Sequence, residues 1–280
     1  VVKVDHKRKR EAVPTVNTDW WNYGGITRSV HLVNVPETHI EDYSVRLSSD
    51  RKHIEGWVSL SARRAGEKIT ISVPELKLNE VMVTDEQGRA QFKISAKPKL
   101  WAPSDPKLYV VILGTGNEAI KDKIGFRTIQ TRGTEILLNG ESVFLKGISI
   151  HEEAPFKTGR VTSAEECKIL LNWAKDLGCN FVRLAHYPHS EDMVREAEKM
   201  GLMVWSEIPV YWTILYENPE TYQNAEKQLS TMIQRDKNRA GVVLWSIANE
   251  TPLSDARNSF LGRLATKARS LDDSRLLTAA

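Results

Sequence analysis

The second half of the chain alternates short apolar runs with amphipathic segments, and this alternation constrains the fold more than any other feature. The apolar runs are FLKGISI at 144–150, CNFVRLA at 179–185, LMVWSEI at 202–208 and VVLWSIA at 242–248. Near-continuous apolar strands are typical of a parallel sheet, because helices cover both of its faces. The alternation therefore predicts an α/β domain built on a parallel sheet.

The segments between these runs carry helix signals. The segment 163–178 begins with Ser163 and places Glu166 three residues later, which is the pattern of a capping box. A second helix is predicted at 190–201, where acidic residues occupy the first turn, as the helix dipole favours. Pro219 opens a third. The first helix is expected to bury one face, formed by Ile169, Leu170, Trp173, Ala174 and Leu177.

Residues 1 to about 133 show a different pattern, with alternating strand-like runs and no long helical segment. Examples are YSVRL at 43–47, KITISV at 68–73 and QFKISA at 91–96, with turn residues between the runs. A β-sandwich over about 36–130 is predicted. Residues 1–35 are too short for a domain of their own, so we expect them to be the last strands of a preceding domain.

Two architectures compete for the second half of the chain. A doubly wound nucleotide-binding sheet has a glycine-rich turn after its first strand, whereas HEEAPFKTGR stands there in this sequence. A (β/α)8 TIM barrel places its chemistry at the carboxyl ends of its strands. Four strand ends in succession carry polar residues, which are His151-Glu152-Glu153, Arg183 with His186 and Tyr187, Glu207, and Asn249-Glu250. The barrel is therefore favoured, with its strands one to about five in 134–280.

Composition and charge exclude several classes of protein. The net charge of +3 is small and only HKRKR at 6–10 is strongly basic, so nucleic-acid binding is a poor hypothesis. No apolar run reaches the length of a membrane span, and the first residues do not resemble a signal peptide. Cys167 and Cys179 are expected to be buried thiols, and no cluster of histidines and cysteines predicts a metal site. A soluble globular protein without a cofactor is predicted.

Each strand-end residue also has a purely structural interpretation. Glu250 stands before Thr251-Pro252, where an acidic residue favours helix entry, and Asn249 could satisfy backbone groups at a turn. His186 could pack in a loop, and His151 could belong to a group of loop charges. Arg183 lies among apolar neighbours and needs a carboxylate partner, for which Glu207 is a candidate.

A catalytic interpretation is open to the same residues. Glu207 and Glu250 lie at the ends of adjacent predicted strands and could form an acid/base pair. Trp205 and Trp245 lie within strands and are expected in the core. Tyr211 and Trp212 follow a strand end and are better placed to stack on a sugar.

Six stretches, taken in order, resemble glycoside hydrolase family two, which contains β-galactosidases, β-glucuronidases and β-mannosidases. They are DWWNYGGITRSV, KLWAPSDPKLY, LNGESVFLKGISIHEE, NFVRLAHYPH, EIPVYW and RDKNRAGVVLWSIANE, and they span essentially the whole chain. The resemblance implies the end of a jelly-roll sugar-binding domain at 1–35, an immunoglobulin-like sandwich at 36–133 and the first half of a TIM barrel at 134–280. It also implies a β-glycoside as substrate, and leaves homo-oligomer formation open.

The resemblance further implies a role for each site residue in a retaining mechanism. Glu250 corresponds to the general acid/base, and Asn249 to the residue that binds the sugar 2-hydroxyl. His151, Arg183 and His186 correspond to positions lining the sugar pocket, and Glu207 to a glutamate that supports it. The family's nucleophile lies on the seventh barrel strand, so we expect it beyond Ala280. The alternative is a catalytically incomplete fragment that binds carbohydrate or serves a structural role.

Overall fold

The computed structural model describes residues 1–280, and the chain forms two compact units. The first, here called the barrel unit, contains Val1–Val30, Phe144–Lys237 and Gly241–Ala280. The second, the sandwich unit, contains His31–Val143 and Asn238–Ala240. Each unit is described by itself. None of the helices combines the length and the apolar composition that crossing a bilayer requires.

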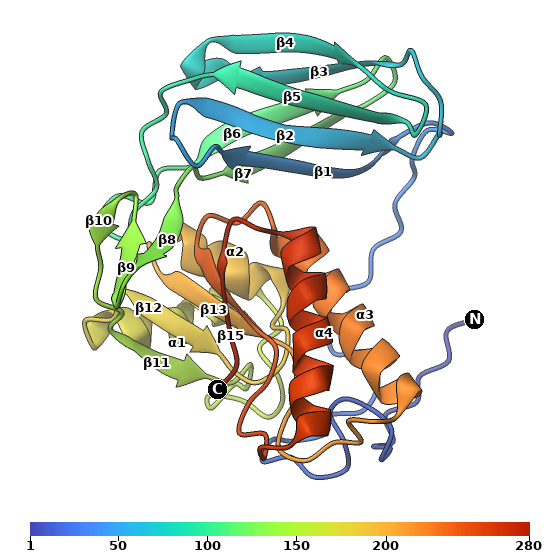
Figure 1. Cartoon of the computed structure of the whole chain (residues 1–280), viewed down its shortest axis with the longest axis vertical. Helices are drawn as coiled ribbons and strands as arrows, with labels where there is room; N and C mark the ends of the chain where they lie inside the picture. The colour runs from blue at the N-terminus through green and yellow to red at the C-terminus, as the bar shows by residue number, and fades with distance from the viewer. The chain divides into compact units, whose positions relative to one another are not determined.

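The sandwich unit consists of two antiparallel sheets that share one core (Figure 1). One sheet has the order β1-β2-β5 and the other β4-β3-β6-β7. Alternate residues face inward, so that Val45 on β1 and Ile71 on β3 are both buried in the common core. The bounds are β1 Ile40–Leu47, β2 His53–Leu60, β3 Lys68–Val73, η1 Pro74–Leu76, β4 Leu78–Val83, β5 Arg89–Ser95, β6 Tyr109–Gly114 and β7 Ala119–Ile124. A small sheet follows, with β8 Ile129–Arg132, β9 Glu135–Leu138 and β10 Glu141–Ser142.

The barrel unit contains a parallel sheet in which each strand pairs with the next one in the chain, β11-β12-β13-β14-β15. A doubly wound sheet would reverse its strand order at a switch point, so the order observed confirms the barrel prediction. The strands are β11 Gly147–Ile150, β12 Phe181–Leu184, β13 Met203–Glu207, β14 Val242–Ser246 and β15 Leu276–Thr278. The helices are α1 Ala164–Asp176, α2 Glu191–Lys199, α3 Pro219–Asp236 and α4 Asp255–Leu271.

Every one of these helices begins at a polar cap, which explains why the chain turns helical there. Ser163, Ser190, Asn218 and Ser254 each accept a hydrogen bond from the backbone N–H three residues later. The predicted cap at Ser163 is confirmed. Both cysteines are buried free thiols, as predicted.

The predicted inward face of α1 is only partly correct. Leu170 and Ala174 are buried, and Cys167 and Leu171 are buried with them. Those four positions follow the i, i+3, i+4, i+7 spacing of a single face. The other three residues of the prediction belong to a neighbouring apolar stripe that remains exposed, and they are Ile169, Trp173 and Leu177. The helix carries two adjacent apolar stripes, and periodicity alone does not decide which one packs on the sheet.

Residues 1–39 contain no strand, so the expectation of strands in 1–35 is not met. The segment packs by its side chains instead. Val13 is buried in the barrel core and its N–H donates to the side-chain oxygen of Asn224, 3.0 Å away on α3. A strand needs a neighbouring strand to accept its ladder hydrogen bonds, and here side chains of α3 take that place. The link between this segment and a jelly-roll domain stays a prediction.

Candidate active site

The carboxyl ends of β11 to β14 gather the predicted site residues at one edge of the sheet. Contacts connect all of them. His151 and His186 have ring centres 5.3 Å apart, and His186 reaches Glu207. Arg183 links Glu207 to Asn249, and Trp212 bonds to Glu250. Parallel strands bring their carboxyl ends to one edge, so side chains distant in sequence meet there.

Glu207 is the centre of a buried charge network. Its side chain is fully buried, and Arg183 donates to both carboxylate oxygens at 2.9 and 3.0 Å. His186 Nδ1 lies 2.7 Å from Oε1, and Trp205 Nε1 donates to Oε2 at 3.0 Å. The pairing of Arg183 with Glu207 confirms the partner proposed from the sequence. A buried ion pair with this many hydrogen bonds compensates the desolvation of both charges.

Trp205 therefore has a polar role that its in-strand position does not reveal. Its indole N–H holds the Glu207 carboxylate, and the Arg183 guanidinium lies 4.6 Å from its ring centre. Trp245, the other tryptophan predicted to lie in the core, is 1% exposed.

Asn249 carries a buried donor that nothing satisfies. The side chain is 3% exposed, and its Oδ1 accepts a hydrogen bond from Arg183 Nη2. That bond orients the amide and leaves Nδ2 without a partner. Backbone bonds to Val210 at 2.8 Å and from Trp212 at 3.1 Å fix the residue in place. An unsatisfied buried N–H costs about 1–3 kcal/mol. A buried donor of this kind is expected to donate a hydrogen bond to a ligand or a water molecule.

Glu250 follows at the rim with an exposed side chain. Trp212 Nε1 donates to its Oε2 at 2.9 Å. Both residues have positive φ, 50° for Glu250 and 54° for Trp212. Bulky side chains rarely adopt this region, and it is found where the surroundings impose a required geometry, most often at functional sites.

The helix-entry interpretation of Glu250 does not hold. The next helix, α4, begins at Asp255 with Ser254 as its cap, and Ser254 accepts from the N–H of Arg257. Asp255 is the acidic residue of the first turn. Glu250 lies outside that turn, and the dipole effect falls off within one turn.

One wall of the site comes from the N-terminal segment. The ring of Trp20 lies 6.1 Å from His151, 5.8 Å from His186, 5.4 Å from Tyr187 and 4.9 Å from Tyr211, measured between ring centres. Burial lowers the pKa of His151, and the neighbouring His186 lowers it further. His151 is therefore a neutral hydrogen-bonding group near pH 7.

Asp19 also belongs to this wall. Asp19, His151 and His186 each offer one ligand atom, and these atoms all lie within 4.8 Å of one another. Burial raises the pKa of Tyr211, and so does its hydrogen bond to Asp19. A set of two imidazoles and one carboxylate could hold a metal ion or several sugar hydroxyls. Asp19 and Trp20 were not predicted to belong to the site, although both stand in DWWNYGGITRSV, one of the six motif stretches.

Glu152, grouped by the sequence with the rim residues, is instead completely buried. Arg28 donates to its Oε2 at 2.7 Å and Arg160 at 3.2 Å, and its backbone N–H donates to Tyr187 Oη at 3.1 Å. The N–H of Ser190, the cap of α2, donates to its Oε1. Glu152 therefore joins the N-terminal segment to the ends of β11 and β12.

The strand order and the polar carboxyl-end rim together are those of part of a TIM-barrel domain. Residues 129–280 match the model of the glycosyl hydrolases family 2 TIM barrel domain, and residues 38–127 match glycosyl hydrolases family 2. The chain belongs to glycosyl hydrolase family 2, as its motifs predict.

Relatives and solved structures agree with this assignment. A beta-glucuronidase of Paenibacillus borealis is 30% identical over 93% of this chain and 46% of its own length. A beta-galactosidase of Halalkalibacterium halodurans is 29% identical over 92% of this chain and 28% of its own length. The crystal structure of Parabacteroides merdae beta-glucuronidase matches with a TM-score of 0.84 at 25% identity, over 99% of this chain and 39% of that one. The chain spans less than half the length of each.

Proposed function

We propose that the chain carries the acid/base half of the active site of a retaining glycoside hydrolase that removes a terminal β-linked sugar. The observation that carries this proposal is the pair at the end of β14. The buried Asn249 Nδ2 has no partner, and the exposed Glu250 carboxylate follows it directly. A neutral donor beside a carboxylate suits a sugar hydroxyl next to the bond that is cleaved. The relatives named above are a beta-glucuronidase and a beta-galactosidase, so a β-glucuronide or a β-galactoside is the proposed substrate.

In this proposal each residue acts on a defined group. Glu250 protonates the leaving oxygen in the first step and takes a proton from water in the second. Asn249 Nδ2 donates to the sugar 2-hydroxyl. His151 and His186 line the sugar pocket. Trp212 holds one oxygen of Glu250, and its ring, with the residue 38% exposed, offers a stacking face for a sugar.

Glu207 is proposed to support the pocket and not to attack the sugar. A nucleophilic carboxylate in a retaining enzyme needs a free oxygen facing the anomeric carbon. The Glu207 carboxylate is fully buried, and its oxygens already accept hydrogen bonds from Arg183 and Trp205 and contact His186. We therefore propose that the nucleophile comes from a later barrel strand.

The test compares the 280-residue chain with a chain extended to a complete barrel. We expect 1–280 to bind but not hydrolyse nitrophenyl β-glucuronide or β-galactoside. The extended chain should hydrolyse one of them, and Glu250→Gln should reduce kcat on a poor leaving group by about 100-fold or more. Turnover by 1–280 that Glu250→Gln abolishes would make Glu207 the nucleophile. Normal turnover of the same substrate by the extended Glu250→Gln chain would contradict the proposed role of Glu250.

Arg183→Lys tests the pocket. Lysine keeps the charge but lacks the planar fork that holds Glu207 and Asn249 together. We expect kcat/KM of the extended chain to fall by about 10- to 100-fold, since a charged hydrogen bond contributes about 1.5–3 kcal/mol. The matched control is Arg195→Lys, an arginine on α2 paired with Glu191 four residues earlier. Equal kcat/KM values for Arg183→Lys and Arg195→Lys would mean that Arg183 has only a structural role.

A further inference from the structure

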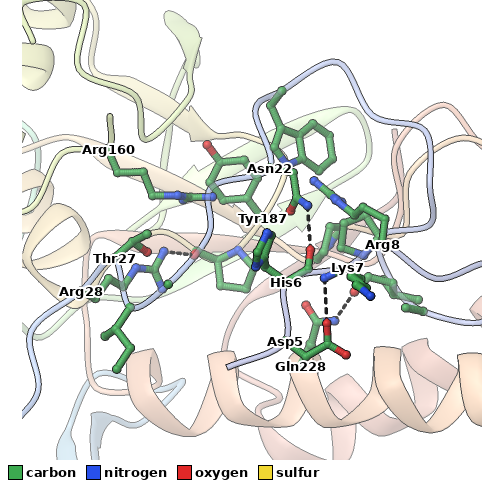
Figure 2. Close-up of a pocket in the computed structure, with 18 residues that line it drawn as sticks. Asp5, His6, Lys7, Arg8, Asn22, Thr27, Arg28, Arg160, Tyr187 and Gln228 are labelled. Carbon is green, nitrogen blue, oxygen red and sulfur yellow. Dashed lines mark hydrogen bonds between the residues drawn. The ribbon is translucent and has the colours of Figure 1, made fainter. Parts of the chain in front are cut away.

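A cavity lies in the barrel unit, apart from the residues proposed for catalysis (Figure 2). Its volume is about 610 Å³, and the N-terminal segment forms much of its wall. Trp20 and Tyr187 line it, and the same two rings stand beside His151. The cavity therefore adjoins the candidate active site across one layer of aromatic side chains. Its volume is in the range of sites that take small organic molecules.

The cavity wall carries an excess of positive charge. Lys7, Arg8, Arg28 and Arg160 line it, whereas Asp5 is the one acidic residue that does. Asp5 already faces Lys9, 3.8 Å away, and accepts the N–H of Lys7. The buried Glu152, behind the wall, is shared between two of the arginines through a single oxygen, with Arg28 at 2.7 Å and Arg160 at 3.2 Å. One buried carboxylate thus compensates two guanidinium groups.

Two lining cations, Lys7 and Arg8, have no carboxylate partner, and the partly buried one of the two is Arg8. Its Nη2 donates to the Thr18 hydroxyl at 3.3 Å, and its Nη1 is a buried N–H without a partner. The guanidinium lies 5.6 Å from the Trp20 ring centre. Burial lowers the pKa of Arg8, and the nearby charge of Arg160 lowers it further. An arginine nevertheless stays protonated in proteins, so an unsatisfied donor and an uncompensated charge both belong to the cavity wall.

We propose that this cavity binds an acidic sugar unit whose carboxylate or sulfate group pairs with Arg8. A guanidinium recognises planar and tetrahedral oxyanions through two parallel hydrogen bonds. A bare inorganic anion would leave most of the 610 Å³ unfilled, whereas a sugar ring fills more of it and packs against Trp20 and Tyr187. The choice of a saccharide rests on the proposed function, while the choice of an anion rests on the charges of the wall alone.

Calorimetry on the 280-residue chain tests this with glucose 6-sulfate and glucuronate as the acidic sugars. Glucose supplies the sugar without the anion, and sodium sulfate supplies the anion without the sugar. We expect binding of at least one acidic sugar, and Arg8→Gln should weaken it by about 10-fold or more, because the charged pair is lost. The matched control is Arg10→Gln, which removes the same charge from a neighbouring arginine that does not line the cavity. It should leave the affinity nearly unchanged.

Several results would overturn the proposal. Equal effects of Arg8→Gln and Arg10→Gln would mean that only the overall positive charge of the N-terminal segment matters. Sodium sulfate binding as tightly as glucose 6-sulfate would mean that the sugar is not recognised. A loss of binding on Asn249→Ala but not on Arg8→Gln would place the acidic sugar in the active site, and the proposed function would stand while this inference fails. If Arg8→Gln does not fold, Arg8→Lys must still weaken binding several-fold, and unchanged affinity there would contradict the proposal.

Discussion

Replacing Glu250 by alanine in the chain extended to a complete barrel is expected to make a covalent glycosyl-enzyme accumulate on dinitrophenyl glycosides. Dinitrophenolate leaves as a stable anion and needs little protonation, so the first step stays fast. The second step slows because water has lost its base, and general base catalysis contributes about 100- to 10,000-fold. On methyl glycosides, whose leaving group needs a proton, turnover should fall by a comparable factor.

The accumulation appears as a burst of dinitrophenolate followed by slow turnover. Glu217→Ala is the matched control, because Glu217 is an exposed glutamate in the loop before α3. It should show no burst and ordinary turnover. Near-normal hydrolysis of methyl glycosides by Glu250→Ala would remove Glu250 from the mechanism.

Glu207→Ala is expected to destabilise the barrel unit by about 3–5 kcal/mol, the usual consequence of removing one partner of a buried ion pair. The substitution leaves the Arg183 guanidinium without its carboxylate and Trp205 Nε1 without its acceptor. Urea unfolding followed by tryptophan fluorescence measures this effect, because Trp57 and Trp101 are the tryptophans of the sandwich unit and all others lie in the barrel unit. Glu217→Ala again serves as the control. A loss below about 1 kcal/mol would mean that Glu207 does not compensate Arg183.

The order of elements could be predicted because local patterns determine it. The apolar runs form strands and Ser163 caps the first helix, as predicted. The observed pairing of each strand with the next one in the chain then excludes a doubly wound sheet. The buried face of α1 could not be chosen in the same way. Leu170 belongs to the face that packs on the sheet and Trp173 to a stripe that does not, and the difference depends on tertiary packing.

The residues of the candidate site that lie at strand ends could be predicted from the sequence. Those that reach the site from distant segments could not. Arg183 and Glu207 stand at neighbouring strand ends, so their pairing follows from the topology. Trp20 reaches the site from more than a hundred residues away, through a segment that forms no strand. The orientation of the Asn249 amide depends on a single hydrogen bond from Arg183, and no sequence pattern predicts that bond.

The configuration of a glycosyl azide shows whether Glu250 is the acid/base of a retaining mechanism. Azide needs no base, so it should restore turnover to Glu250→Ala in the extended chain by attacking the glycosyl-enzyme. Two inversions at the anomeric carbon give net retention, and proton NMR of the product should therefore show the β-glycosyl azide. The inverted α-glycosyl azide would show that Glu250 is not the acid/base. That product arises by direct displacement in an enzyme that has lost its nucleophile, so Glu250 would then be the nucleophile.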